Sequence, residues 1–199
     1  MTTLMTIQPL TSCPVESPFG TLTAVASDEG VRAILWPADR PARAGLAGST
    51  VRNGTSDVLA ETARQLAEYF AGARTAFDLP LDLHGTPFQL SAWQALGEIP
   101  YGQTRTYAEQ AALLGRPAAV RSVGAANGRN PVSIVLPCHR VVGSGGELRG
   151  FAGGLKVKAA LLALERSTLA PGRSRTPEPG RDELGSLGPV ALGGESAVP

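Results

Sequence analysis

The chain has 199 residues, of which 43% are hydrophobic, and it carries a formal net charge of only +1. This composition allows a buried core in one domain or two small ones, while the near-neutral charge indicates no particular partner. Because the start has no signal-peptide pattern and no run of roughly 18 apolar residues occurs, we expect a soluble, cytoplasmic protein that does not contact a membrane.

Residues 1–84 predict a small α+β domain. Two β-prone runs, residues 20–26 and 31–36, flank a Ser-Asp-Glu-Gly segment with turn chemistry, and this pattern indicates a hairpin. The hairpin would begin a small antiparallel sheet. Residues 37–56 are rich in Pro, Gly, Arg and Ser, which is typical of a long loop.

A helix and an edge strand complete this expected domain. The helix is predicted from Asp57, as its N-cap, to Phe70, and Gly72 would close it. Residues 77–84 alternate apolar and other side chains, which is typical of a half-buried strand. Pro80 lacks a backbone N–H, so this strand would lie at the edge of the sheet.

Residues 85–167 predict a mostly helical second domain. The Thr-Pro-Phe-Gln sequence of residues 86–89 is a capping box with proline at the first helical position, and its helix would end near Gly97. A second capping box, Thr-Tyr-Ala-Glu at residues 106–109, would open a helix that stops at Gly115.

A third helix is predicted from Pro117 to about Gly128, and the two short helices with their Gly-Arg turn form a helix-turn-helix candidate. Ordinary helix corners show the same pattern. One face of the third helix would pack against the domain, and the other would face outward. The packing face would hold Val120, Val123, Gly124 and Asn127, and the outward face Ala118, Arg121, Ser122, Ala125 and Arg129.

The region around these helices is basic. Between Leu113 and Gly150 there are five arginines and one acid, a local charge of 5 − 1 = +4. On the outward face Arg121 stands among small side chains, from which it could reach into a narrow, negatively charged groove. Two plainer interpretations stay open: a genome that prefers arginine codons, and a surface helix with a solvated arginine.

Residues 136–142 read Leu-Pro-Cys-His-Arg-Val-Val and hold one of the two cysteines and one of the two histidines. Residues 132–136 predict a short buried strand that ends at the proline. In a regular strand Cys138 and His139 point to opposite faces, so His139 could activate the thiol only through a bend or a bridging water. An activated thiol also needs an electropositive setting, which the adjacent Arg140 would provide.

Other interpretations of Cys138 stay open at this point. A lone buried cysteine is usually a small hydrophobe. Two cysteines and two histidines scattered along the chain form neither a metal-ligand cluster nor a disulfide framework. A cysteine hydrolase would need a distant histidine, for which His84, on a predicted strand, is the only candidate.

The chain is expected to end in a loop, a helix and a tail. Residues 143–154 are rich in glycine and predict a loop, and residues 155–166 predict an amphipathic helix. Residues 168–199 are dominated by Pro, Gly, Ser and Ala without periodicity, which predicts a disordered, dispensable tail.

Two stretches resemble a known family. Residues 130–143 read Asn-Pro-Val-Ser-Ile-Val-Leu-Pro-Cys-His-Arg-Val-Val-Gly, and residues 150–155 read Gly-Phe-Ala-Gly-Gly-Leu. With the Thr-Pro-Phe-Gln helix start and the Pro-Tyr-Gly turn at residues 100–102, they resemble the O6-alkylguanine-DNA alkyltransferase family over residues 20–166. The motif around the cysteine is long and correctly spaced, so the resemblance favours a reactive Cys138.

The resemblance implies a ribonuclease-H-like N-terminal α+β domain and a mostly α, winged-helix-like C-terminal domain that contains the helix-turn-helix. It also implies direct-reversal DNA repair, in which an alkyl group moves irreversibly from O6 of guanine, or from O4 of thymine, to Cys138 in a single turnover. The partner would be double-stranded DNA containing O6-alkylguanine, bound in the minor groove by a monomer, with cooperative binding left open. The lesion would be flipped out because the alkylated oxygen is shielded inside the duplex.

The resemblance also implies roles for the residues at the centre of the site. Cys138 would be the nucleophile and alkyl acceptor, and His139 would take its proton through a water. Glu165 would hold the imidazole in the useful tautomer. Asn130 would brace the turn that makes this geometry possible.

Further residues would contact DNA and the flipped base. Arg121 would fill the gap left in the stack, and Tyr107 would donate a hydrogen bond to the flipped base. The carbonyls of Cys138 and Val141 would accept from the guanine amino group, and the Ala152 N–H would donate to the alkylated oxygen. The remaining expected contacts are Ala118, Ala119, Ser122, Ala125, Asn127, Arg129 and Phe151.

This chain departs from the family pattern at three positions. Phe151 stands where tyrosine is common, Ala152 where some members have serine, and Ser133 where proline is frequent at the pocket rim. These changes could alter which alkyl groups fit, but none removes a reacting group. Some relatives bind zinc in the N-terminal domain; Cys13 and His84 are too few for such a site, so we expect no metal and no cofactor.

Two rival functions follow from the same residues. A non-catalytic lesion-binding module of the same fold would recognise alkylated bases, but relatives of that kind lack the reactive cysteine. A cysteine hydrolase or thiol-redox protein would turn over repeatedly, and it would need a distant histidine or a Cys-x-x-Cys motif that the chain lacks.

Overall fold

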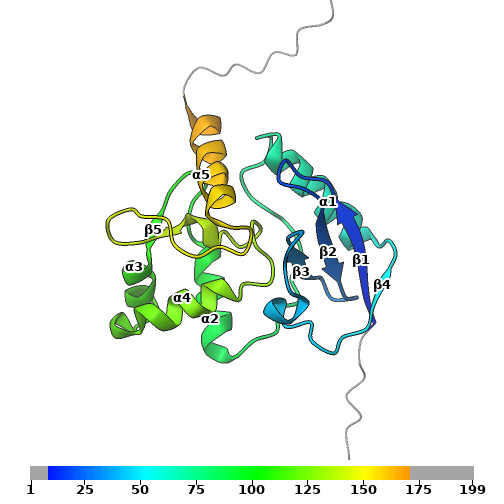
Figure 1. Cartoon of the computed structure of the whole chain (residues 1–199), viewed down its shortest axis with the longest axis horizontal. Helices are drawn as coiled ribbons and strands as arrows, with labels where there is room; N and C mark the ends of the chain where they lie inside the picture. Colours follow the sequence, from blue (N-terminus) through cyan, green and yellow to red (C-terminus); the bar gives the residue numbers. More distant parts are fainter. Residues whose placement is uncertain (1–8, 171–199) are drawn as a thin grey trace, which may run out of the picture.

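Figure 1 shows the computed structural model of the protein, which describes residues 9–170. A four-stranded sheet with helix α1 against it forms one domain, and helices α2 to α5 gather beside it in a second. The expected fold class, an α+β domain followed by a mostly helical one, is confirmed. Within the described range no helix combines the length and the apolar character needed to cross a membrane.

The N-terminal sheet has the strand order β3-β2-β1-β4. The predicted hairpin is confirmed as the antiparallel pair of β2 and β3. The sheet is mixed, however, and not purely antiparallel as expected, because β4 pairs in parallel with β1. The strands are β1 (Leu10–Val15), β2 (Leu22–Ala26), β3 (Val31–Leu35) and β4 (Val51–Asn53).

Strand β1 and the elements inside the expected loop at residues 37–56 were not predicted from the sequence. Strand β4 pairs only with residues 10–12 of β1. Pro14 has no N–H to donate, and it lies beyond the part of β1 that pairs with β4. Inside the expected loop, a 3-10 helix, η1 (Pro41–Ala44), precedes β4. Ala44 packs against one face of the sheet.

The other face of the sheet packs against α1 (Asp57–Phe70), which contacts β1, β2 and β3. The N-cap is Ser56 and not Asp57 as expected: the Ser56 Oγ accepts a hydrogen bond from the Leu59 N–H at 3.3 Å. Gly72 follows the helix with φ = 66°, the left-handed conformation that closes many helices. The helix buries Tyr69 completely.

The strand predicted over residues 77–84 does not form. The segment runs beside β3 and makes a single bridge to it, in which the Val31 N–H donates to the Pro80 carbonyl at 2.8 Å and the Asp82 N–H donates to the Val31 carbonyl at 3.0 Å. Because Pro80 has no N–H, the ladder cannot continue through it. The predicted alternation of buried and exposed side chains is nevertheless present, since Leu79 and its apolar neighbours are half-buried against the core.

The second domain is built from capped helices. Both predicted capping boxes are confirmed: Thr86 and Thr106 accept hydrogen bonds from the N–H groups of Gln89 and Glu109. The predicted third helix begins as a 3-10 turn, η2 (Pro117–Ala119), and continues as α4. The other elements are α2 (Pro87–Gly97), α3 (Tyr107–Leu113), α4 (Val120–Gly128), α5 (Leu155–Leu169) and the parallel pair of β5 (Arg105–Thr106) and β6 (Val141–Val142).

The faces of α4 agree with the predicted pattern. Val123 is fully buried, and the five side chains expected to point outward, Arg121 among them, are all exposed. Asn127 corrects the expectation that it contacts DNA: it is buried, and its Nδ2 donates to the Gln110 Oε1 at 2.7 Å. Its side chain therefore joins α4 to α3 and does not reach the outward face.

The last helix is longer than predicted. α5 continues to Leu169, so the first residues of the expected tail are helical. The Tyr101 hydroxyl donates to the Thr168 Oγ1 at 3.3 Å, which ties this end of the helix to the turn after α2. The rest of the expected tail, residues 171–199, lies outside the described residues.

Candidate active site

The strand predicted over residues 132–136 is a tight turn instead. The Asn130 side chain spans it, since its Oδ1 accepts from the Val132 N–H at 3.1 Å and its Nδ2 donates to the Leu136 carbonyl at 2.8 Å. Ile134 has φ = 79°, a left-handed conformation that a β-branched residue rarely adopts. Backbone strain of this kind clusters at functional sites, where surrounding contacts hold it in place.

The cysteine lies on a 3-10 helix, η3 (Cys138–Arg140), and not at the end of a strand. Pro137, with φ = −81° and ψ = 63°, bends the chain into this helix. Successive residues of such a helix are about 120° apart, so Cys138 and His139 do not point to opposite faces. Both side chains are buried, with exposed fractions of 6% and 0%.

Glu165, on α5, is the acceptor at which several elements meet. Its Oε1 accepts from the His139 Nε2 at 2.8 Å, the Tyr69 hydroxyl at 2.7 Å and the Arg140 Nη2 at 2.9 Å. Its Oε2 accepts from the Gly102 N–H at 2.9 Å. Burial alone would raise the pKa of this carboxyl, but the hydrogen bonds from His139 and Arg140 outweigh burial and lower it to about 2. Glu165 is therefore ionised throughout the neutral range.

The ionised carboxylate determines the tautomer of His139. Because Glu165 can only accept, the proton of the neutral ring lies on Nε2, and Nδ1 is left with a lone pair. Nδ1 is buried and has no hydrogen-bond partner among residues 9–170. Burial lowers the pKa of His139, so the ring is neutral at neutral pH and its Nδ1 can accept a proton.

Cys138 is protonated in the same pH range. Burial raises the pKa of the thiol, and the Asn130 side chain and the charges of Lys158 and Arg43 only partly oppose this effect. A thiol in this state is a weak nucleophile, so it must lose its proton during any reaction at the sulfur. A neutral imidazole next to it in the chain is suited to that task.

Arg140 does not have the role expected for it. It was expected to supply positive charge to the thiol, but its guanidinium binds Glu165 and donates to the Ile99 carbonyl at 2.6 Å. It also lies over the Tyr101 ring, 5.4 Å from the centroid. The cations that act on Cys138 are instead Lys158 and Arg43, and neither was predicted from the sequence.

Lys158 is fully buried on α5. Its Nζ donates to the carbonyls of Val141 and Arg149, at 2.6 Å each, and burial lowers its pKa to about 8. This lysine ties the strand after the cysteine to the loop that follows. The burial of Lys158 could have been predicted from its spacing, because it lies on the same face of the helix as the buried Leu161 and Leu162.

The N-terminal domain contributes to the site as well. The Arg43 Nη1 donates to the Asn130 carbonyl at 2.6 Å, and Asp39 holds the same guanidinium through two hydrogen bonds. Trp36 packs edge-on against Phe151, with ring centroids 5.4 Å apart. The Phe151 ring lies in turn 6.2 Å from the His139 ring, so the aromatic wall of the site is supported from the other domain.

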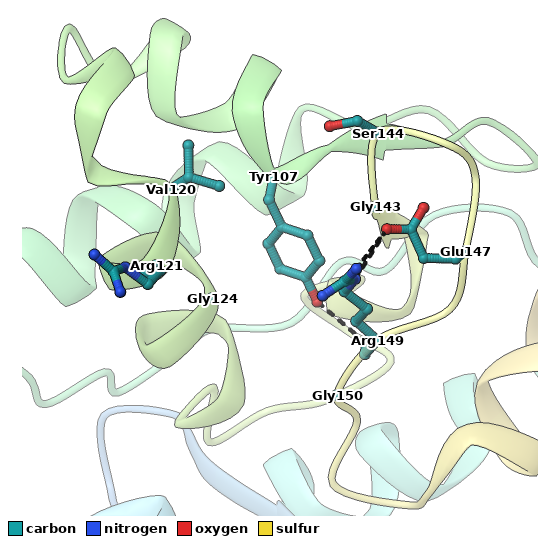
Figure 2. A pocket seen from close by; sticks show the side chains of 9 residues that line it. All are labelled: Tyr107, Val120, Arg121, Gly124, Gly143, Ser144, Glu147, Arg149 and Gly150. Atoms are coloured by element: carbon teal, nitrogen blue, oxygen red, sulfur yellow. Dashed lines mark hydrogen bonds and ion pairs between the residues drawn. The ribbon is translucent and has the colours of Figure 1, made fainter.

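A cavity of about 380 Å³ lies between α4 and the loop after β6. Figure 2 shows Tyr107 crossing it toward Arg149, whose carbonyl accepts from the Tyr107 hydroxyl at 3.1 Å, while Arg121 points away from this pair. The loop side carries an ion pair between Glu147 and Arg149 with an N···O distance of 2.9 Å. The lining residues are Tyr107, Val120, Arg121, Gly124, Gly143, Ser144, Glu147, Arg149 and Gly150.

The expected DNA-contacting residues are thus distributed over three places. Tyr107 and Arg121 line the cavity, and Phe151 and Ala152 are half-buried in the loop beside it. Val141 is buried, and its carbonyl accepts from Lys158. The others, Asn127 excepted, lie on or next to the outward face of α4: Ala118, Ala119, Ser122, Ala125 and Arg129.

Within residues 9–170 there is no group of three or more His, Cys, Asp or Glu side chains that could hold a metal ion.

Both domains match family models. Residues 13–83 match the model described as 6-O-methylguanine DNA methyltransferase, ribonuclease-like domain. Residues 87–167 match the model described as 6-O-methylguanine DNA methyltransferase, DNA binding domain.

Individual proteins are similar over most of the chain. A methylated-DNA–protein-cysteine methyltransferase of Methanosarcina barkeri is 44% identical over 155 residues, which cover 78% of this chain and 96% of that protein. One of Mycolicibacterium paratuberculosis is 47% identical over 152 residues, covering 76% and 90%. The crystal structure of Mycobacterium tuberculosis OGT in complex with DNA is 40% identical, with a TM-score of 0.70 over 80% of this chain and 94% of that one.

Proposed function

The chain belongs to the 6-O-methylguanine DNA methyltransferase family, and we propose from this premise that Cys138 is the cysteine that accepts the alkyl group. The protein repairs DNA by direct reversal, moving an alkyl group from O6 of guanine to one of its own cysteines. The observation that carries the assignment to Cys138 is its place beside a buried imidazole that an ionised glutamate orients.

In the proposed reaction the Cys138 sulfur attacks the alkyl carbon in line with the bond to O6. The S–C bond forms as the C–O6 bond breaks, and the bonding pair leaves with the base, which takes up a proton and becomes guanine. The thiol proton passes through a water to the His139 Nδ1. The thioether has no route back to a thiol, so each molecule acts once.

The ionisation of the site supports His139 as the base. The thiol is protonated and the imidazole is neutral at neutral pH, so the proton has a donor and an acceptor in the required states. Glu165 stabilises the imidazolium that forms, and Arg140 keeps Glu165 from taking the proton itself. Asn130 braces the turn through its bonds to Val132 and Leu136.

Binding of DNA is the second part of the proposal. The outward face of α4 would enter the minor groove, where small side chains allow a close approach and Arg121 would replace the flipped base in the stack. The flipped base would lie beside Tyr107, with the Val141 carbonyl and the Ala152 N–H as partners. O4-alkylthymine would be a minor substrate. The protein would act as a monomer.

Mass spectrometry tests the assignment. After incubation with a duplex that contains one O6-methylguanine, each protein molecule should carry one added methyl group, on the peptide that holds Cys138. A methyl group on Cys13, or on neither cysteine, would refute it. Tight binding of the duplex with no loss of the lesion methyl would favour the non-catalytic rival.

Arg121→Ala is expected to slow repair of duplex DNA by about ten- to a hundredfold, because flipping costs a few kcal/mol that the side chain helps to offset. Reaction with free O6-benzylguanine should change little, since a free base needs no flipping. Arg129→Ala is the matched control, because Arg129 is exposed at the C-cap of the same helix but does not line the cavity. At saturating duplex, Arg129→Ala should recover the wild-type rate, whereas equal losses on both substrates for Arg121→Ala would exclude this role.

A further inference from the structure

We propose that Tyr69 of the N-terminal domain is a positioning residue for alkyl transfer: its hydroxyl holds Glu165 and limits how strongly Glu165 stabilises a charged His139. The inference rests on the proposed roles of Cys138, His139 and Glu165. It gives the N-terminal domain a direct part in the chemistry of a site whose reacting residues all lie in the other domain.

The Tyr69 ring is held rigidly. The residue lies on α1, is fully buried, and belongs to the core that the two domains share. It packs edge-on against Phe70 and Tyr101, with ring centroids 5.6 Å and 6.0 Å apart, and lies 5.4 Å from the Phe77 ring. A ring fixed on several sides loses little further freedom when its hydroxyl binds, so the hydroxyl is a preorganised donor.

The hydroxyl reaches the reacting groups themselves. It donates to the Glu165 Oε1 at 2.7 Å and lies 3.4 Å from the His139 Nε2. Burial, followed by the charge of Glu165, raises the pKa of Tyr69 well above its usual value, so it remains protonated and can only donate to the carboxylate. Tyr69 and His139 therefore share one carboxylate oxygen.

Sharing this oxygen has a consequence for the base. Each donor on Oε1 withdraws negative charge that would otherwise stabilise the imidazolium, so the Tyr69 hydrogen bond keeps the pKa of His139 from rising. The other charged or titratable groups that act on this pair are Arg140 on η3, Lys158 on α5 and Tyr101 after α2. None of these groups is changed when the Tyr69 hydroxyl is removed.

Tyr69→Phe isolates the hydroxyl, because it keeps the ring. The rate of methyl transfer in a single turnover should rise with pH as His139 becomes neutral, and in Tyr69→Phe this rise should move up by about half to one pH unit. The rate would then be about three- to tenfold lower on the rising part of the profile and equal to wild type on the plateau. A purely structural role would lower the rate at every pH alike.

Tyr101→Phe is the matched control. It removes a hydroxyl from the ring that touches Tyr69, but that hydroxyl donates to Thr168 and not to Glu165. Its pH profile should overlay that of the wild type. The same displacement in both variants would overturn the proposal, and so would an unmoved profile in Tyr69→Phe.

A second readout does not depend on alkyl transfer. The chain has only two histidines, so the ring nitrogen NMR signals of His139 can be assigned and followed as the pH changes. In Tyr69→Phe the His139 titration should move to higher pH, and an unmoved His139 titration would refute the inference. Failure of the wild-type protein to methylate Cys138 would refute the proposed function alone.

Discussion

A Cys138→Ser variant is expected to bind duplex DNA containing O6-methylguanine and to transfer no methyl group from it. A serine hydroxyl in this buried position stays protonated and is a far weaker nucleophile than a thiolate. The two side chains differ little in size, so the turn that Asn130 braces should be preserved. Mass spectrometry of the protein and a gel-shift assay with the same duplex would measure transfer and binding separately.

Cys13→Ser is the control for this experiment. Cys13 lies on β1 of the N-terminal sheet and is the chain's other cysteine, also unpaired. This variant should still gain one methyl group per molecule. Methyl transfer by Cys138→Ser, or its loss in Cys13→Ser, would show that the acceptor has been assigned to the wrong residue.

The burial of Cys138 suits a residue that can react only once. A thiol held protonated by burial is protected from oxidants and from adventitious alkylating agents, since the thiolate is the reactive form. Activation then depends on a base that acts when the substrate is in place, and the neutral His139 is such a base. A permanently ionised thiol would react faster, but it would also be lost sooner to side reactions.

Local chemistry made part of this fold predictable. The capping boxes at Thr86 and Thr106 determine where α2 and α3 begin, because their hydrogen bonds lie within four consecutive residues. The outward face of α4 followed from helical periodicity alone. The family motif around Cys138 identified the residues to which the chemistry is assigned.

Contacts between distant segments were not predictable. β4 pairs with β1 across about 40 residues of sequence, and nothing in either short segment marks that pairing. The residues before Cys138 are β-branched and apolar and so resemble a strand, but the Asn130 side chain supplies turn hydrogen bonds that periodicity cannot reveal. Arg43 and Tyr69 reach the site from the other domain for the same reason.

Glu165→Gln is expected to lower the free energy of unfolding at neutral pH by about 3 kcal/mol or more, because it leaves the buried Arg140 without its counterion. Methyl transfer should fall as well, since the amide cannot stabilise a charged His139. Denaturant unfolding at several pH values and single-turnover kinetics would measure the two losses.

The acid stability of Glu165→Gln tests the same contacts through their pH dependence. The pKa of Glu165 is about 2 in the folded protein against an ordinary 4.5, so its contribution to stability is complete above about pH 4.5 and is lost as the pH falls toward 2. Wild type should therefore lose stability more steeply than Glu165→Gln across this window.

Glu61 is the matched control, because its pKa is also lowered to about 2, chiefly by the Arg64 side chain, but it is exposed on α1. Solvent screens that ion pair, so Glu61→Gln should follow wild type. If the two substitutions changed the pH dependence of stability alike, burial of the Glu165 hydrogen bonds would add nothing to their contribution to stability.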